Sequence, residues 1–273
     1  GVLTSVSARL FPLPDADRTL VYTSPSTKAL AQAAKALSLS PIPLAALELL
    51  DPLLLTPGDA EHRKGFVSGP DHGRALDSGQ PLGPGLVLRI LGSREQVEGT
   101  EARVLSEIGG ALGDPRVVEG EESLAFHRSL NEWESGAGLV ARMKLLPSGM
   151  EALLDEVKEL RRLARDGLIV SKAASAGIRV DAAAHVGTGL MRVAVRGLPE
   201  KGEALGPWIP VLASLRGRLE SRGGTLRLSQ GPEEIMTGLN PWGRREEVEN
   251  TLMLGLKERF DPRGIMAPGR LAL

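Results

Sequence analysis

The order of the expected secondary structure elements constrains the fold of this chain more than any other feature of the sequence. Alternation of apolar and polar residues predicts strands at residues 2–10, 18–22, 86–91, 116–119, 138–146, 178–184, 189–195 and 225–228. Helical spacing predicts helices at 26–39, 93–112, 122–134, 150–166, 206–222 and 245–260, and residues 44–50 fit a strand or a short helix. The order strand, helix, strand, strand, helix, strand therefore occurs twice. It predicts an α+β fold with two ferredoxin-like halves and helices packed on one face of an antiparallel sheet.

Three local patterns refine this expectation. Ser24 or Ser26 is expected to cap the helix at 26–39, because a serine hydroxyl accepts a hydrogen bond from the first turn. Residues 150–166 form the clearest amphipathic helix, with Leu153, Val157, Leu160 and Leu163 on one stripe. Residues 56–85 are rich in Gly, Pro, Asp and His, which predicts a long loop.

The charge balance and composition exclude several classes of partner. Lys plus Arg (33) nearly equal Asp plus Glu (34) and aromatic residues make up only 3%, so we expect no nucleic-acid partner. The most apolar stretch, residues 37–55, is interrupted by prolines and acidic residues, and we expect no direct membrane insertion. The chain has no cysteine, which excludes disulfides, iron–sulfur ligation and thiolate metal sites within it. These features predict a soluble protein. The lack of cysteine does not determine its compartment, and we expect it to be cytoplasmic.

The C-terminal run carries the most specific motif. It reads Asp261-Pro262-Arg263-Gly264-Ile265-Met266-Ala267-Pro268-Gly269-Arg270 after a helix. This run resembles the closing signature of the FAD-linked oxidases, DP-x-x-I-x-NPG followed by Lys or Arg, and it departs from the signature at Ala267, where the family usually has Asn. The resemblance implies that the fold is the cap domain of this oxidase class and that Pro268, Gly269 and Arg270 contact FAD.

The N-terminal run is similar to another part of the same family. Gly1, Val2, Leu3 and Thr4 resemble the last strand of the flavin-binding domain and are implied to contact FAD. The implied domains are residues 1–14 as the end of that domain, 15–255 as the cap or substrate domain, and 256–273 as a segment returning toward FAD. A Gly-rich flavin-binding lobe is expected to precede Gly1, so FAD would be bound by the full-length protein and not by this chain alone. We also expect exposed apolar side chains near both ends.

The histidines that serve catalysis in this family are mostly absent. His185 matches the first histidine of an H-x-G-D-G-N-x-H run, but Thr188, Leu190 and Arg192 replace its Asp, Asn and second His. The later G-E-H-G run is replaced by residues 228–232, which contain no histidine. We therefore expect no catalytic residue and no metal site in this chain. The departures resemble the accessory FAD-binding subunit of glycolate oxidase, which implies partner subunits, including an iron–sulfur subunit and a sibling that carries the catalytic histidines.

His185, Arg142 and Arg192 are the candidate substrate residues. An arginine fork binds a carboxylate through two hydrogen bonds, as a small 2-hydroxy acid such as glycolate or D-lactate requires. A hydrogen-bonded structural histidine and solvated arginines on a strand face are the alternative interpretation. A non-catalytic α+β protein-interaction module is the alternative function, and an aromatic or longer 2-hydroxy acid is the alternative substrate. The implied partner subunits also allow peripheral attachment to the inner face of a membrane.

Overall fold

The computed structural model describes residues 5–7, 13–51, 54, 84–166, 177–199, 201–243 and 247–266. Its first half contains β1 (Ala16–Thr23), α1 (Thr27–Leu39), β2 (Ala46–Leu50), β3 (Gly85–Gly92), α4 (Arg94–Leu112) and β4 (Arg116–Glu119). The four strands pair in the order β4-β1-β3-β2, and every pair is antiparallel. Residues 44–50, for which the sequence allowed a strand or a helix, thus contribute a strand.

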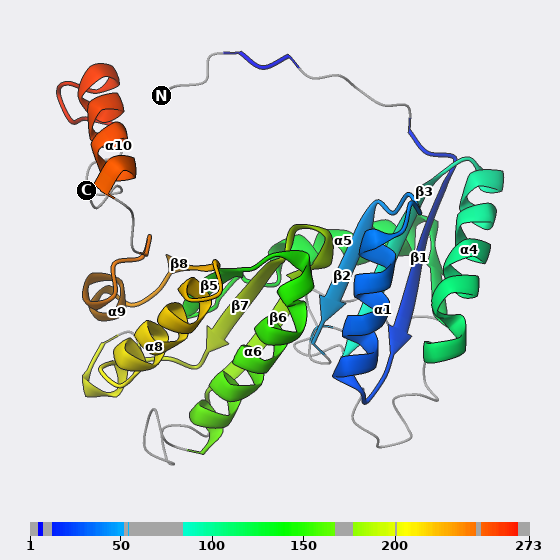
Figure 1. Ribbon diagram of the computed structural model, residues 1–273, viewed down its shortest axis with the longest axis horizontal. Helices are drawn as coiled ribbons and strands as arrows, with labels where there is room; N and C mark the ends of the chain where they lie inside the picture. Colours follow the sequence, from blue (N-terminus) through cyan, green and yellow to red (C-terminus); the bar gives the residue numbers. More distant parts are fainter. Residues whose placement is uncertain are drawn as a thin grey trace.

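The second half repeats this arrangement with β5 (Leu139–Lys144), α6 (Met150–Arg165), β6 (Arg179–His185), β7 (Leu190–Arg196), α8 (Trp208–Glu220) and β8 (Thr225–Gln230). Its strands pair in the order β6-β7-β5-β8, which is the order of the first half read in reverse. Because β2 pairs with β6, the two halves form one eight-stranded antiparallel sheet (Figure 1). The predicted α+β fold with two ferredoxin-like halves is confirmed.

Other helices lie outside this repeat. The helix α5 (Gly120–Glu132) connects the two halves, and α9 (Glu233–Gly238) and α10 (Glu247–Phe260) follow β8. The sequence did not predict α9. The predicted strand at 2–10 and the predicted loop at 56–85 lie largely outside the described residues. Among the described residues, no helix has the length and apolar character that crossing a membrane requires.

Serine side chains fix the first turns of α1 and α4. The Ser26 hydroxyl accepts a hydrogen bond from the Ala29 N–H at 3.2 Å, which confirms Ser26 as the cap. At the start of α4, Ser93 and Gln96 each bind the backbone N–H of the other, forming a capping box. These bonds satisfy N–H groups that have no partner within the helix.

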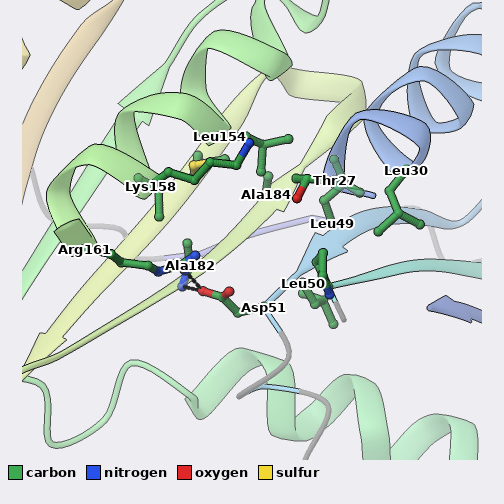
Figure 2. Close-up of a pocket in the computed structure, with 13 residues that line it drawn as sticks. Thr27, Leu30, Leu49, Leu50, Asp51, Leu154, Lys158, Arg161, Ala182 and Ala184 are labelled. Carbon is green, nitrogen blue, oxygen red and sulfur yellow. Dashed lines mark hydrogen bonds and ion pairs between the residues drawn. The ribbon is translucent and has the colours of Figure 1, made fainter. Parts of the chain in front are cut away.

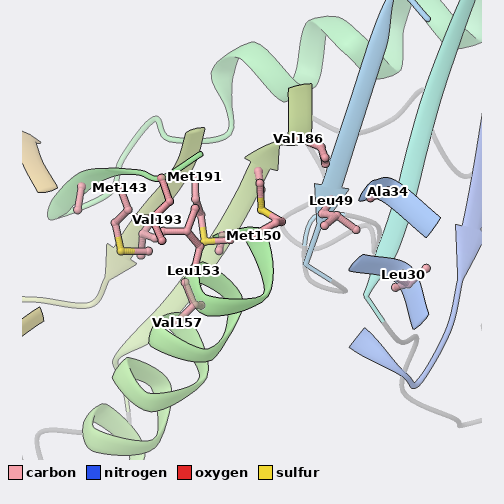
Figure 3. Packing of buried hydrophobic residues seen from close by; sticks show 14 of the residues in the cluster. Leu30, Ala34, Leu49, Met143, Met150, Leu153, Val157, Val186, Met191 and Val193 are labelled. Carbon is pink, nitrogen blue, oxygen red and sulfur yellow. The ribbon is translucent and has the colours of Figure 1, made fainter. Parts of the chain in front are cut away.

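The main hydrophobic core lies between one face of the sheet and the helices α1, α4, α6 and α8. Side chains alternate along a strand, so Met143, Met191 and Val193 point from the sheet toward α6, which contributes Leu153 and Val157 (Figure 3). Leu160 is also buried and Leu163 is partly buried, so the predicted stripe of α6 faces the core. Burial of each such side chain stabilises the fold by about 1.5–3 kcal/mol, which makes this face the main source of cohesion.

The helix α5 departs from the predicted packing of helices on one face. Its side chains Phe126 and Leu130 join a smaller core on the opposite face of the sheet, together with Val21, Val87 and Val140. An amphipathic pattern predicts that one side of a helix is buried, but it does not determine which face of a sheet the helix covers. We call this second face of the sheet the α5 face.

Apolar side chains are exposed near both ends of the chain, as expected. Val6 is 76% exposed and Ile265 is 66% exposed. The helix α10 lies apart from the sheet in Figure 1, and its Val248, Leu252 and Phe260 are also exposed.

Candidate functional site

Three arginines lie side by side on the α5 face, one on each of three neighbouring strands. Arg142 of β5 pairs with Arg192 of β7 on one side and with Arg227 of β8 on the other. The residues that flank them in each strand point into the main core, so the arginines point the other way; the flanking residues are Ala141, Met143, Met191, Val193, Leu226 and Leu228. We call Arg142, Arg192 and Arg227 the arginine row.

One carboxylate and one indole ring face the arginine row from the chain that follows α5. The Glu134 carboxylate lies 3.4 Å from Arg142 Nη2 and 3.5 Å from Arg192 Nη1. The Arg192 guanidinium also lies over the Trp133 ring, 5.6 Å from its centroid. Within the described part of the chain, Arg227 has no hydrogen-bond or ion-pair partner. Arg142 and Arg192 therefore share one carboxylate, and with Arg227 the row carries an excess of positive charge that suits a small anion.

His185 and Glu48 lie beside the arginine row on the same face. The register pairs Glu48 of β2 with His185 of β6, and the Glu48 Oε1 lies 4.0 Å from the His185 Nε2. The other ring nitrogen, His185 Nδ1, lies 3.2 Å from the Thr188 hydroxyl oxygen. The residue two positions before His185, Ala183, pairs with Arg192. His185 and Arg192 are therefore diagonal neighbours across two strands, within reach of long side chains.

The Glu48 carboxyl group is nearly enclosed by the protein. Only 13% of its side chain is exposed, and its Oε2 has no hydrogen-bond partner among the described residues. Burial raises the pKa of Glu48 to about 7, although the positive charge of Arg192 acts in the opposite direction. A large fraction of Glu48 is therefore protonated at neutral pH, and this neutral carboxyl group is able to donate a hydrogen bond.

The structure brings the three predicted substrate residues together on one face. The predicted cofactor residues lie outside the described part of the chain. His185, Arg142 and Arg192 lie on one face within three neighbouring strands. The residues expected to contact FAD lie outside the described residues; they are Gly1, Val2, Leu3, Thr4, Pro268, Gly269 and Arg270.

Sequence reasoning missed Glu48, Glu134 and Arg227. Alternation along residues 46–50 and 225–230 would have placed Glu48 and Arg227 on the side away from Leu47, Leu49, Leu226 and Leu228. No local signal would have found Glu134, because its contact with the arginines depends on which face α5 covers. In the described ranges, no three histidine, cysteine, aspartate or glutamate side chains could hold a metal ion together.

A buried polar network near β1 has the residue types of a hydrolytic triad but a structural environment. The Ser123 hydroxyl donates to Asp17 Oδ1 at 2.6 Å, and Thr19 Oγ1 lies 2.7 Å from Ser123 Oγ and 2.9 Å from His127 Nε2. Arg89 forms an ion pair with Asp17. Ser123 and Thr19 are fully buried. The network therefore attaches α5 to the sheet and has no room for a substrate.

The main core face carries a cavity of about 180 Å³ between α1 and α6. Its carboxylate is already paired: Asp51 Oδ2 accepts hydrogen bonds from Arg161 and from the Ala182 N–H (Figure 2). Leu49, Leu154 and other apolar side chains line the rest. On the α5 face, by contrast, Glu48 Oε2 has no hydrogen-bond partner among the described residues, and Arg142 and Arg192 share the single carboxylate of Glu134. The α5 face is therefore the better candidate site.

Comparison with known proteins supports the fold. No model of a known protein family matches the sequence. The chain is similar to an alkyldihydroxyacetonephosphate synthase (TM-score 0.57, 12% identity, 92% of this chain and 44% of that one). It is also similar to a p-cresol methylhydroxylase with substrate bound (TM-score 0.55, 18% identity, 94% and 53%). A third similar structure is the 4-ethylphenol oxidase from Gulosibacter chungangensis in complex with isoeugenol (TM-score 0.57, 13% identity, 94% and 54%).

These likenesses establish a shared fold. The chain spans about half the length of the solved structures that it matches. The architecture implied by the resemblance to FAD-linked oxidases therefore occurs in this chain.

Proposed function

We propose that this chain is the cap domain of an FAD-linked oxidoreductase subunit that handles a small 2-hydroxy acid such as glycolate or D-lactate. The observation that carries the proposal is the arginine row, which places three arginines on neighbouring strands beside His185 on the α5 face. An arginine fork binds a carboxylate through two parallel hydrogen bonds, and the fold is shared with an oxidase and a hydroxylase.

The residues of this chain bind and orient the acid in the proposed reaction. Arg142, Arg192 and Arg227 hold the carboxylate, while Glu134 keeps two of the arginines in place before the substrate arrives. FAD, bound by the full-length protein, would supply the acceptor for the two electrons of the oxidation. In this proposal residues 1–14 and 256–273 lie beside FAD, and residues 15–255 form the substrate side.

The proposed subunit works in a complex of glycolate oxidase type. The replacement of the second family histidine by Arg192, together with the missing later histidine, supports a sibling subunit that carries the catalytic histidines. An iron–sulfur subunit would pass the electrons onward. In this proposal the complex is cytoplasmic, and its partner subunits provide any attachment to the inner face of a membrane.

Spectroscopy of the full-length protein, purified with its partner subunits, tests this function. We expect visible flavin absorption bands that bleach when glycolate or D-lactate is added without oxygen. Replacing Arg192 with Gln removes charged hydrogen bonds to the substrate and should lower kcat/KM about tenfold to a hundredfold. The control Glu159→Gln, on the exposed side of α6, should leave the rate unchanged.

Two results would contradict the proposal. Rapid glycolate turnover by this subunit without its sibling would contradict the division of labour. A full-length protein without flavin would instead favour the non-catalytic interaction module, for which the exposed side chains of α10 offer a docking surface.

A further inference from the structure

Glu48 has a feature that carboxylate binding does not explain. Its Oε2 is buried without a hydrogen-bond partner among the described residues, although Arg192 is near enough to influence its charge. A buried polar atom without a partner destabilises a folded protein by about 1–3 kcal/mol, so such atoms are rare. The other carboxyl oxygen, Oε1, lies 4.0 Å from His185 Nε2.

The hydrogen bonds of Thr188 determine which nitrogen of His185 is available to a ligand. The Thr188 hydroxyl donates to the His185 carbonyl oxygen at 3.3 Å, and the same hydroxyl oxygen lies 3.2 Å from His185 Nδ1. A hydroxyl that donates to the carbonyl accepts from Nδ1–H. In the neutral ring, Nε2 is then an acceptor, and it is this nitrogen that faces Glu48.

We propose that Glu48 and His185 form a pair that recognises the hydroxyl group of the 2-hydroxy acid, an inference that rests on the function proposed above. The carboxyl group of Glu48 donates a hydrogen bond to the hydroxyl oxygen, and the hydroxyl donates its own proton to His185 Nε2. The 4.0 Å between Glu48 Oε1 and His185 Nε2 allows one oxygen atom to lie about 2.8 Å from both groups.

The electrostatics of the site support this assignment. Burial favours the protonated form of Glu48, which is the form that donates. The positive charge of Arg192 opposes protonation, and a bound carboxylate would neutralise that charge. Binding of the ligand carboxylate to the arginine row therefore favours protonated Glu48, the form that donates a hydrogen bond to the ligand hydroxyl.

The register places the two recognition elements at a suitable separation. His185 and Arg192 are diagonal neighbours on adjacent antiparallel strands, so their Cβ atoms lie about 7–8 Å apart or less. The long Arg192 side chain covers part of this distance. A ligand whose carboxylate and hydroxyl are on adjacent carbons is thus able to contact both elements, whereas acetate contacts the arginines alone.

Calorimetric titration of the full chain with glycolate and with acetate tests the inference. We expect glycolate to bind about tenfold more tightly than acetate. Replacing Glu48 with Met or His185 with Leu should reduce this ratio to near one while leaving the affinity for acetate within about threefold. The ratio compares two ligands on the same variant, so a general loss of folding does not change it.

Conservative variants separate recognition from structure. Glu48→Gln retains a donor and should keep most of the preference for glycolate. Thr188 acts as a positioning residue: Thr188→Val should reduce the ratio, and Thr188→Ser should preserve it. Glu159→Met, on the exposed side of α6, is the control and should change neither affinity.

The outcomes distinguish this inference from the proposed function. Equal affinity of the wild type for glycolate and acetate would overturn hydroxyl recognition, while loss of both ligands in Arg192→Gln would still support carboxylate binding by the arginine row. Absence of binding by either ligand would overturn both.

Discussion

At the scale of single residues, two acidic side chains of the α5 face show how a partner decides the charge of a buried group. Burial alone would raise the pKa of Asp17, but hydrogen bonds from Arg89 and Ser123 and the charge of Arg89 lower it below its ordinary value. Glu48 lacks such bonds, so burial raises its pKa to about 7. Asp17 therefore holds α5 in place as an anion, whereas Glu48 is available for a ligand.

The raised pKa of Glu48 predicts a pH dependence of stability. In the folded state Glu48 holds a proton that the unfolded state releases above the ordinary pKa of 4.5. The contribution of this proton to the free energy of unfolding is therefore fully present below pH 4.5 and is lost as pH rises through about 7. The shift of 7 minus 4.5 corresponds to up to about 3 kcal/mol at about 1.36 kcal/mol per unit.

Replacing Glu48 with Gln should remove this loss. We expect the variant to be about 1–3 kcal/mol more stable than the wild type at pH 8 and nearly equal to it at pH 4.5, measured by urea unfolding. Glu98→Gln, at an exposed position of α4, should follow the wild type at both pH values. An unchanged difference between wild type and Glu48→Gln across this range would mean that Glu48 is ionised in the folded protein.

At the scale of elements, the turn between β6 and β7 depends on Gly189. Its backbone has φ +65°, and a Cβ at this position would lie 1.9 Å from the Leu145 carbonyl oxygen. Gly187, in the same turn, has a negative or extended φ, and its Cβ would meet only His185 at 3.7 Å. The chain after β5 thus passes so close to Gly189 that no side chain fits there, whereas Gly187 has room for one.

Gly189→Ala should destabilise the chain by at least about 2 kcal/mol, because left-handed backbone strain adds to the overlap with Leu145. The matched variant Gly187→Ala should change stability by no more than about 0.5 kcal/mol. Thermal unfolding of both variants measures the difference. Equal effects of the two substitutions would show that the turn tolerates a side chain at either glycine.

The elements of the repeat could be predicted from the sequence because each follows one period over many residues. The stripe of α6 identified a buried helix, and alternation identified both strands around Gly189. The six residues of α9 are too few to show a helical period. Long-range packing determines which face of the sheet α5 covers, and no local sequence pattern indicates that face. The contact of Glu134 with the arginine row depends on it and could not be predicted either.

At the scale of the whole molecule, the two halves meet along a short strand pair. The register of β2 and β6 joins Glu48 to His185, Leu49 to Ala184 and Leu50 to Ala183. The candidate hydroxyl pair therefore lies on the junction itself, while the arginine row belongs to the second half alone. A stable junction is thus a condition for the site, because Glu48 and Arg192 come from different halves.

Asp51 is the residue that strengthens this junction. Directly after β2, its Oδ2 accepts hydrogen bonds from the Ala182 N–H of β6 at 2.7 Å and from Arg161 of α6 (Figure 2). Its own N–H donates to the Ala182 carbonyl at 3.1 Å. Arg161 in turn donates to the Val180 carbonyl at 3.0 Å. One carboxylate thus links the first half to a strand and a helix of the second.

Replacing Asp51 with Ala should destabilise the chain by about 2–3 kcal/mol, since it leaves the Ala182 N–H and the Arg161 Nη2 without their acceptor. The loss should be local: hydrogen exchange should accelerate in β2 and β6 before it accelerates in β1, β3, β5 or β7. Asp51→Asn keeps an acceptor oxygen and should have a smaller effect, and Asp155→Ala, at an exposed position of α6, should have none. Exchange that rises equally in all strands would mean that the halves unfold as one unit, and the hydroxyl pair would then be as stable as the sheet itself.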